Sequence, residues 1–445
     1  MEAARTRRYP FVSRGEAPPV AVARAEGPWL VTPDGRRIYD AAGGAIVASL
    51  GHGRAEIAEA VRDALAAESF VVPPFATPSR IRLVERLQER WLPPGITRCL
   101  FASGGSEAMD AAIRIARQHH LSAGRPSRWK VIGRALSYHG TTLATLAVGG
   151  HAKRRAGFEP YFFDAPQAPA CYPLRCALCR GRDGCTLACA DALEALVLRE
   201  GPETVAAFVA EPVGGSTAGA LVPAEGYWPR VAEICRRYGV LLVADEVMCG
   251  FGRTGRKFAT DHFGVVPDVL VAGKGLAAGY APICGIFATE AVVEPIAARG
   301  DEVMFYTYAA HPGACAAADK ALEIAEREGL VERAAAMGEL LARRLAPLAD
   351  HPHVGEVRGL GLLHAVELVR DKASLEPFAK ELRFTARVVA AGLAHGVFVY
   401  PGGCDPARDV VCFGPPLTIG PDEIDFVVGA FEKALADVCA RLARA

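Results

Sequence analysis

The chain has 445 residues, 51% of them hydrophobic and 22% charged, and its 50 basic side chains balance its 50 acidic ones. This ordinary globular composition, without net charge, gives no electrostatic reason to expect nucleic acid or a membrane surface as a partner. No stretch reaches the roughly 18 apolar residues of a spanning helix, and no apolar run follows the basic N-terminus as in a secretory signal. We therefore expect a cytoplasmic protein, and the odd number of cysteines, 13, argues against a secreted disulfide framework.

The first 69 residues are expected to form a segment that contributes to a smaller domain. After a polar stretch that we interpret as an arm, a Pro33-Asp34-Gly35 turn separates two strand-like runs, which is typical of a small hairpin. Residues 55–68 then repeat apolar side chains at helical spacing.

From residue 70 to 325, helical patterns alternate with short apolar runs, which predicts a large domain built on a mostly parallel sheet wrapped by helices. The expected strands are 98–102, 130–132, 205–210, 240–244, 269–272 and 283–288. Residues 326–445 change to a long helix (331–348), strands within 357–369 and 397–400, and closing helices. We therefore expect an α/β chain with a second, smaller α+β domain at its C-terminal end.

Two of the expected strands lead directly to charged residues. Asp245 and Glu246 follow one strand, and Lys274 follows another between two glycines, in a chain with only eight lysines. Ligands bind at the carboxyl ends of strands in open α/β sheets. An acid and a lysine at this edge could hold the two ends of pyridoxal phosphate, the lysine as a Schiff base and the acid on the pyridinium nitrogen. A magnesium or phosphate site for the acid and a solvated position for the lysine remain the alternatives.

A glycine-rich turn after the first expected strand is a candidate phosphate site. Ser103-Gly-Gly-Ser106 opens a helix, where free N–H groups and the helix dipole attract an anion. The alternative is a simple helix start with a serine cap, and Glu107 could be only a first-turn acid.

Further candidates follow other strands. Tyr138 could stack on a flat ring or be a core tyrosine, and Glu211 would face the same cleft as Asp245. Thr307, ahead of an alanine-rich helix, is a candidate phosphate contact.

These segments, in this order, resemble the class III pyridoxal-phosphate-dependent aminotransferases, the ω-aminotransferase group, over essentially the whole chain. The most specific part is Asp245-Glu-Val-Met-Cys-Gly-Phe-Gly-Arg-Thr-Gly255, together with Pro267-Asp268 and Gly273-Lys274-Gly275. Ser-Gly-Gly-Ser-Glu-Ala, Tyr-His-Gly, Glu-Pro-Val and Thr-Tyr-Ala-Ala-His-Pro-Gly match further family blocks. The resemblance implies the type I fold of pyridoxal-phosphate enzymes.

The resemblance also implies a role for each site residue. Lys274 would form the Schiff base and then act as general base, while Asp245 would keep the pyridine nitrogen protonated. The other implied cofactor-binding residues are Gly105 and Ser106 for the phosphate, Val247 and Tyr138 for the ring faces, His139 beside them, and Glu211 near the cofactor's hydroxyl side or the substrate. Thr307 would reach the phosphate in the partner subunit's site, so a homodimer with shared sites is expected, and no metal is.

The activity implied is amino transfer from an ω-amino acid or amine to an oxo acid, with pyruvate favoured, in a ping-pong cycle. An aminomutase or a decarboxylating transaminase of the same fold remains open. A nucleotide-binding oxidoreductase is a remote alternative, because the Gly-x-Gly-x-x-Gly spacing is missing and Lys274 would have no role. Substrate specificity is expected in the loops at 45–52, 70–77 and 400–409.

Two departures from the family pattern bear on the substrate and on metal binding. Cys412 stands where glutamate-using members have an arginine before the Pro-Pro-Leu block, and Arg408 is only a candidate replacement. This substitution favours the amine and ω-amino acid branch. The second departure is a cysteine-rich insert, with spacing compatible with a zinc knuckle or with a set of reduced thiols. Its cysteines are Cys171, Cys176, Cys179, Cys185 and Cys189.

Overall fold

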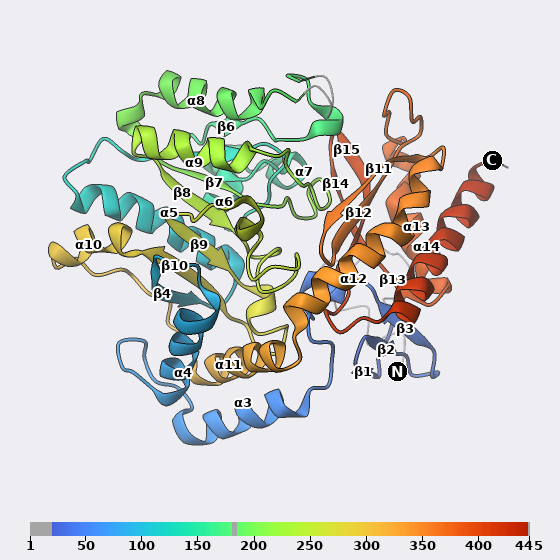
Figure 1. The fold of residues 1–445 in the computed structure, drawn as a ribbon, viewed down its shortest axis with the longest axis horizontal. Helices are drawn as coiled ribbons and strands as arrows, with labels where there is room; N and C mark the ends of the chain where they lie inside the picture. Colours follow the sequence, from blue (N-terminus) through green and yellow to red (C-terminus); the bar gives the residue numbers. More distant parts are fainter. Residues whose placement is uncertain (1–19, 180–184, 444–445) are drawn as a thin grey trace.

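A seven-stranded sheet forms the centre of the computed structural model, which describes residues 20–179 and 185–443 (Figure 1). The order is β4-β10-β9-β8-β7-β5-β6, and neighbouring strands are parallel except at β10, which is antiparallel to both β4 and β9. The strands are β4 (Ile96–Ala102), β5 (Lys130–Arg134), β6 (Gln167–Ala168), β7 (Val205–Ala210), β8 (Leu241–Asp245), β9 (Val269–Ala272) and β10 (Cys284–Thr289). All six predicted strands are present within two residues of their predicted ends, and only the two-residue β6 was missed.

Helices cover both faces of this sheet because alternate residues of its strands point to opposite sides. Helices α5 (Gly105–Ser122) and α10 (Glu290–Ala298) pack on one face, over side chains such as Val243 and Val271. Helices α8 (Ala188–Glu200), α9 (Tyr227–Tyr238) and α11 (Pro312–Arg327) pack on the other, over Leu242 and Leu270. The remaining helices of this part are α3 (Ala55–Glu68), α4 (Pro78–Arg86), the π-helical η1 (Leu87–Trp91), α6 (Leu143–Val148) and α7 (Ala152–Arg155).

Two four-stranded sheets build the smaller part of the molecule, to the right in Figure 1. One joins the two ends of the chain, since β1 (Arg24–Glu26), β2 (Trp29–Val31) and β3 (Arg37–Asp40) are completed by β13 (Val397–Phe398), which is parallel to β3. The other, antiparallel, has the order β11-β12-β15-β14. Its strands are β11 (Val354–Leu360), β12 (Leu363–Leu368), β14 (Tyr400–Cys404) and β15 (Ala407–Phe413).

Helices α12 (Leu330–Leu345), α13 (Phe384–Ala394) and α14 (Pro421–Leu442) lie beside these two sheets (Figure 1). Short helices connect the larger elements: α2 (Gly43–Ile46) and the 3₁₀ turns η2 (Glu159–Tyr161), η3 (Pro173–Arg175), η4 (Pro202–Thr204), η5 (Ala259–Phe263), η6 (Lys274–Leu276), η7 (Ala346–Asp350) and η8 (Lys380–Leu382). No helix between residues 20 and 443, the masked loop aside, is long and apolar enough to cross a membrane. The N-terminal strands pair with a strand of the smaller part, as expected of a segment that contributes to it. The exact domain boundaries stay a prediction. Residues 1–19 of the expected arm lie outside the described residues.

The segment 357–369, expected to be extended, is a hairpin. Gly361 makes the turn between β11 and β12 with a φ of 56°, a conformation that glycine adopts at little cost. A Cβ at this position would lie 2.2 Å from the backbone of Thr254, so the turn also allows two chain segments to approach closely. The strand β15 was not predicted, because residues 400–409 were expected to form a loop, whereas Arg408 and Asp409 belong to the strand.

A buried ionic cluster fastens the smaller part to the larger one. Arg358 of β11 donates a 2.7 Å hydrogen bond to Glu367 of β12 and another, also 2.7 Å, to the carbonyl of Gly219. Tyr172 and Arg175, from the cysteine-rich segment, bind the same carboxylate. Burial alone raises the pKa of Glu367, but Arg358 and Tyr172 outweigh burial and hold this pKa below its ordinary value. The carboxylate is therefore ionised and shared by three segments of the chain.

Removing the shared carboxylate should destabilise the protein strongly. Glu367→Ala leaves the buried Arg358 guanidinium without its counter-ion, so we expect the free energy of unfolding to fall by about 3–5 kcal/mol. The control is Glu339→Ala, which breaks an exposed pair with Arg343 and should change this free energy by less than about 1 kcal/mol. Thermal melting of both variants measures the difference, and similar melting temperatures would contradict a stabilising role for the cluster.

Candidate functional site

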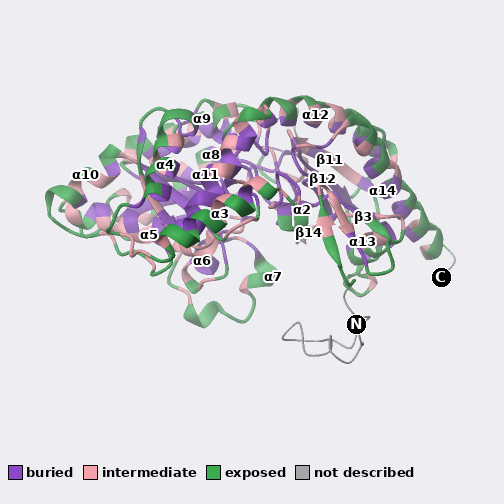
Figure 2. Cartoon of the chain, turned by 90° about the horizontal axis from the view of Figure 1, so that it is seen from below, coloured by how far each residue is buried: buried purple, intermediate pink, exposed green. Residues whose placement is uncertain are grey.

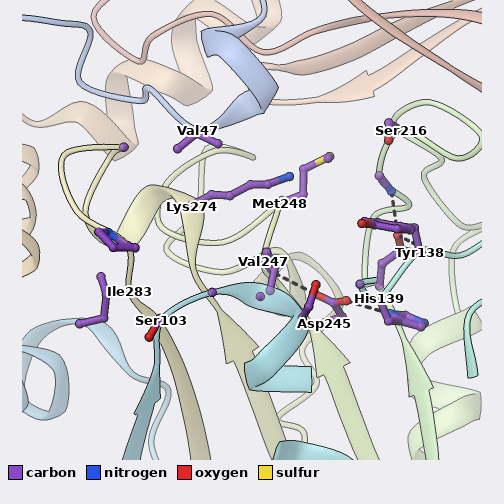
Figure 3. Close-up of a pocket in the computed structure, with 18 of the residues that line it drawn as sticks. Val47, Ser103, Tyr138, His139, Ser216, Asp245, Val247, Met248, Lys274 and Ile283 are labelled. Atoms are coloured by element: carbon purple, nitrogen blue, oxygen red, sulfur yellow. Dashed lines mark hydrogen bonds and ion pairs between the residues drawn. The ribbon is translucent and has the colours of Figure 1, made fainter. Parts of the chain in front are cut away.

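A cavity of about 310 Å³ opens at the carboxyl edge of the central sheet (Figure 3). Parallel strands bring their carboxyl ends to one edge, so residues far apart in the sequence meet there. The cavity is lined by residues that end or follow five of the strands: Ser103 after β4, Tyr138 and His139 after β5, Glu211 after β7, Asp245 at the end of β8, and Lys274 after β9.

Asp245 is held in one orientation at the floor of this cavity. Its Oδ2 accepts a 2.8 Å hydrogen bond from Nδ1 of His139, and its Oδ1 accepts a 3.0 Å bond from the backbone N–H of Val247. Both side chains are buried, and Nε2 of His139 has no hydrogen-bond partner among the described residues. The site thus presents a fixed carboxylate supported by an imidazole.

Lys274 extends across the cavity toward Met248 (Figure 3). Its backbone has a φ of 25°, and its neighbours have to be glycine, since a Cβ at Gly273 would lie 2.8 Å from Sγ of Cys284 and one at Gly275 2.9 Å from Phe251. Burial lowers the pKa of the Lys274 amine to about 8, although Asp245 and other nearby acids oppose this shift. At neutral pH roughly one amine in ten is then unprotonated, against roughly one in 2,500 for an ordinary lysine.

An anion cradle faces the amine from the start of α5. Gly104 caps this 18-residue helix, whose first N–H groups have no partner within the helix. Gly140 lies so close that a Cβ there would be 2.7 Å from Oγ of Ser106, which itself accepts a 3.1 Å bond from the Thr141 N–H. Glu107 turns back and accepts a 2.9 Å bond from the Ser103 N–H, so it belongs to the helix start. The cradle therefore offers N–H and hydroxyl donors to an anion such as a phosphate.

Glu211 binds the backbone that shapes the wall of the cavity. Its Oε1 accepts 3.3 Å bonds from the N–H groups of Tyr138 and Gly215, and Arg134 lies 3.5 Å from Oε2. Burial raises the pKa of this carboxyl, His139 and Arg134 oppose the shift, and Asp245 adds to it. The side chain lines the cavity and at the same time fixes the segment that carries Tyr138.

Several lining residues were not named as site candidates from the sequence. Val47, Ser216, Met248 and Ile283 are apolar or small side chains that form the walls seen in Figure 3, although Met248 lies within the motif at 245–255. Val47 lies in the predicted specificity loop 45–52, whereas no described residue of 70–77 or 400–409 lines this cavity.

Three sequence candidates lie outside the cavity. Thr307 is exposed and does not line it. Arg408 is half-buried. It forms a 2.7 Å ion pair with Asp405 and donates to the carbonyl of Phe378, and these contacts hold it within the fold. Cys412 is buried in an apolar cluster to which both the smaller and the larger part of the molecule contribute.

The cysteine-rich insert lies beside the buried ionic cluster. The backbone N–H of Cys179 donates to Sγ of Cys176 at 3.3 Å, and that of Ala224 donates to Sγ of Cys171 at 3.3 Å. In the part of the chain that the structure describes, no three His, Cys, Asp or Glu side chains are arranged to hold a metal ion. The zinc alternative therefore gains no support, and all 13 cysteines are free thiols.

Comparison with known proteins identifies the family. A sequence model of the class-III aminotransferases matches residues 11–435. An uncharacterized aminotransferase of Schizosaccharomyces pombe is 38% identical, covering 98% of this chain and 96% of the relative. The hypotaurine/taurine–pyruvate aminotransferase of Paracoccus denitrificans is 37% identical (95% and 92% covered), and the putrescine–pyruvate aminotransferase of Pseudomonas aeruginosa is 34% identical (94% and 91%).

Solved structures agree with this result. An (S)-enantioselective omega-transaminase from Thermomicrobium roseum superposes with a TM-score of 0.89 at 39% identity, covering 95% of this chain and 93% of the other. The omega transaminase from Pseudomonas jessenii in complex with PMP gives a TM-score of 0.92 at 33% identity, covering 98% and 97%.

The chain belongs to the class III aminotransferase family and has the type I fold of enzymes that use pyridoxal phosphate. The cavity fits this cofactor on its own evidence: a lysine with a lowered amine pKa, a buried carboxylate, an imidazole nitrogen without a partner, and a glycine-lined anion cradle. The sequence-based recognition of the family and of the cofactor is confirmed.

The lowered pKa of Lys274 can be measured in the cofactor-free protein. Acetic anhydride acylates only neutral amines, so the acylation rate of Lys274 should rise with pH, reach half of its maximum near pH 8, the region of its pKa, and level off above that pH. Peptide mapping by mass spectrometry follows Lys274 and the exposed lysines in the same sample, whose rates should still be rising at pH 9. A Lys274 rate that climbs in parallel with theirs would contradict the lowered pKa.

Proposed function

We propose that this aminotransferase takes its amino group from a primary amine or ω-amino acid and passes it to an oxo acid, with pyruvate favoured, in a ping-pong cycle. The observation that carries the proposal is the lining of the cavity: Lys274 is the only lysine or arginine among its described lining residues, and Val47, Met248 and Ile283 are apolar walls. A carboxylate next to the reacting amine would lie there without a cation, which is costly. The names of the taurine and putrescine relatives support the same donor class and acceptor.

Seven of the predicted site residues have a part in binding or using the cofactor. Gly105 and Ser106 would hold the cofactor's phosphate, Val247 and Tyr138 would pack on its ring, and Asp245, oriented by His139, would pair with its ring nitrogen. Bound pyridoxal phosphate supplies the electron sink for the charge left when a proton leaves the amine-bearing carbon. Lys274 is the group that takes and returns that proton, and a pKa of about 8 leaves both of its forms populated at neutral pH.

We further propose a homodimer in which Thr307 contributes to the partner's site. The surface around Thr307 carries exposed apolar side chains, Met304, Phe305 and Tyr308, and the ring of Tyr308 lies 6.0 Å from that of the exposed Phe70. Apolar patches of this kind mark interaction surfaces, and a second copy of the chain is the occupant that the predicted role of Thr307 requires. Sedimentation that gives the mass of one chain at micromolar concentration would contradict this. The unpaired thiols suit the reducing cytoplasm, where we place the enzyme.

The substrate proposal is tested by a screen of donors and acceptors. Aryl amines, diamines and ω-amino acids are offered with pyruvate or 2-oxoglutarate, and the aminated product and carbon dioxide are measured. We expect amino transfer, faster with pyruvate, without carbon dioxide release, and none in the matched control Lys274→Ala. Release of carbon dioxide, or isomerisation of the donor without an acceptor, would favour the decarboxylating or aminomutase alternatives; transfer by Lys274→Ala would contradict the role of the lysine.

The fixed carboxylate is tested by Asp245→Asn, which preserves shape and removes the charge. We expect kcat to fall by about 10²–10³-fold, the scale for one preorganised electrostatic contact, or about 3–4 kcal/mol. The control Asp371→Asn changes an exposed acid and should leave kcat within about twofold. A rate for Asp245→Asn near that of the unmodified enzyme would contradict its proposed role.

A further inference from the structure

We propose that Arg154 selects donors that carry an acidic group, a carboxylate or sulfonate, at the end remote from the amine. The proposal rests on the amino transfer proposed above and names a substrate class for the same site. The reason to look for such a residue is electrostatic. The described lining of the cavity holds two acids, Glu211 and Asp245, against the single amine of Lys274. A cation that binds the remote acid of a donor must therefore lie beyond the cavity walls, at their rim.

Arg154 lies beside one of those walls. It belongs to α7, which projects from the body of the molecule at the lower edge of Figure 2. The carbon of its guanidinium lies 4.5 Å from the centroid of the Tyr138 ring, and Tyr138 lines the cavity. A positive charge is therefore in contact with an aromatic ring that lines the cavity. The flexible arginine stem gives this charge further reach.

The guanidinium is also available to a ligand. Arg154 is exposed, and over residues 20–179 and 185–443 its side chain has no hydrogen bond or ion pair apart from the contact with Tyr138. The next residue is different in kind: Arg155 donates to the carbonyls of Leu146, Ala147 and Gly149 and so anchors α7 to α6. One arginine thus holds the short helix in place while its neighbour leaves all five N–H donors free.

No acid among the described residues forms an ion pair with Arg154, whose one recorded side-chain contact is with Tyr138. Lys153 precedes it and is exposed. His151 packs edge-on against Tyr138 at 6.4 Å, and burial lowers the pKa of its imidazole to about 4, so it is neutral at pH 7. An acidic donor group that reaches this rim meets a guanidinium able to bind it in bidentate fashion. Such a contact suits carboxylates and sulfonates alike, since a carboxylate offers two acceptor oxygens on one carbon and a sulfonate offers three on one sulfur, two of which can accept from the same guanidinium.

The experiment compares two donors that differ only in the remote acid, 5-aminopentanoate and pentylamine. The rate of the donor half-reaction is followed in the loaded enzyme without an oxo acid, through the loss of the cofactor's visible absorbance. In Arg154→Gln we expect the specificity constant for 5-aminopentanoate to fall by about 10- to 100-fold, the loss of a charge-assisted contact, and that for pentylamine to change by less than about twofold. Arg154→Lys, which keeps the charge but not the fork, should recover part of the loss.

Two controls separate this contact from other effects. Arg343→Gln removes the same charge from an exposed position on α12 and should leave both donors unchanged. 3-Aminopropanesulfonate should follow 5-aminopentanoate in all variants. An equal loss for both donors in Arg154→Gln would mean that Arg154 only positions Tyr138, and no loss would mean a solvated stacking contact; either result overturns the proposal. Failure of the unmodified enzyme with every donor would instead contradict the proposed function itself.

Discussion

The parallel pairing of β7, β8 and β9 is the constraint on which the site depends. Ala210 pairs with Ala244, and Asp245 pairs with Val271, so Glu211, Asp245 and the glycine before Lys274 reach the same edge within two residues of each other. Side chains alternate along a strand, and a slip of one residue would turn Asp245 away from the cavity and into the helical layer. The buried aliphatic faces of these strands, which have to match the helices on both sides, fix this register and with it the chemistry.

The charged residues of the motif at 245–255, which begins at the end of β8, have two different roles. Asp245 faces the cavity, whereas Glu246 points the other way and accepts hydrogen bonds from the N–H groups of Ala259 and Thr260 at 2.9 and 2.7 Å. Burial raises the pKa of Glu246 to about 7. Arg253, whose pKa burial lowers to about 10, donates to the carbonyls of Leu362 and Pro415. These two charged residues tie loops together, so the motif both places the acid and joins the parts that surround it.

The ends of the strands also explain how much of the site could be predicted from the sequence. Strand ends are readable because apolar runs of fixed length stop at charged or glycine residues, and Asp245, Lys274, Tyr138 and Glu211 all came from that pattern. The motif at 245–255 and the loop 45–52 were singled out, but the sequence did not show that Met248 and Val47 line the cavity, because a single methionine or valine carries no sign of the direction it faces. Arg154 was not found, because an exposed arginine looks the same at any surface position. The hairpin at Gly361 was missed because a one-glycine turn inside an apolar run resembles a continuous strand. Thr307 lies outside the cavity of its own chain, and its predicted target is the cofactor site of another.

The pairing of β3 with β13 constrains the order in which the parts of the enzyme fold. Residues 37–40 leave the ribosome hundreds of residues before their partner at 397–398 does, while the whole seven-stranded sheet lies between them in the sequence. The sheet can form first, but the segment that carries Val47 has no completed sheet beneath it until the C-terminal strands arrive. The binding wall is thus finished last, and a chain that stops short of β13 would have its proton-moving lysine in place beside an unfinished pocket.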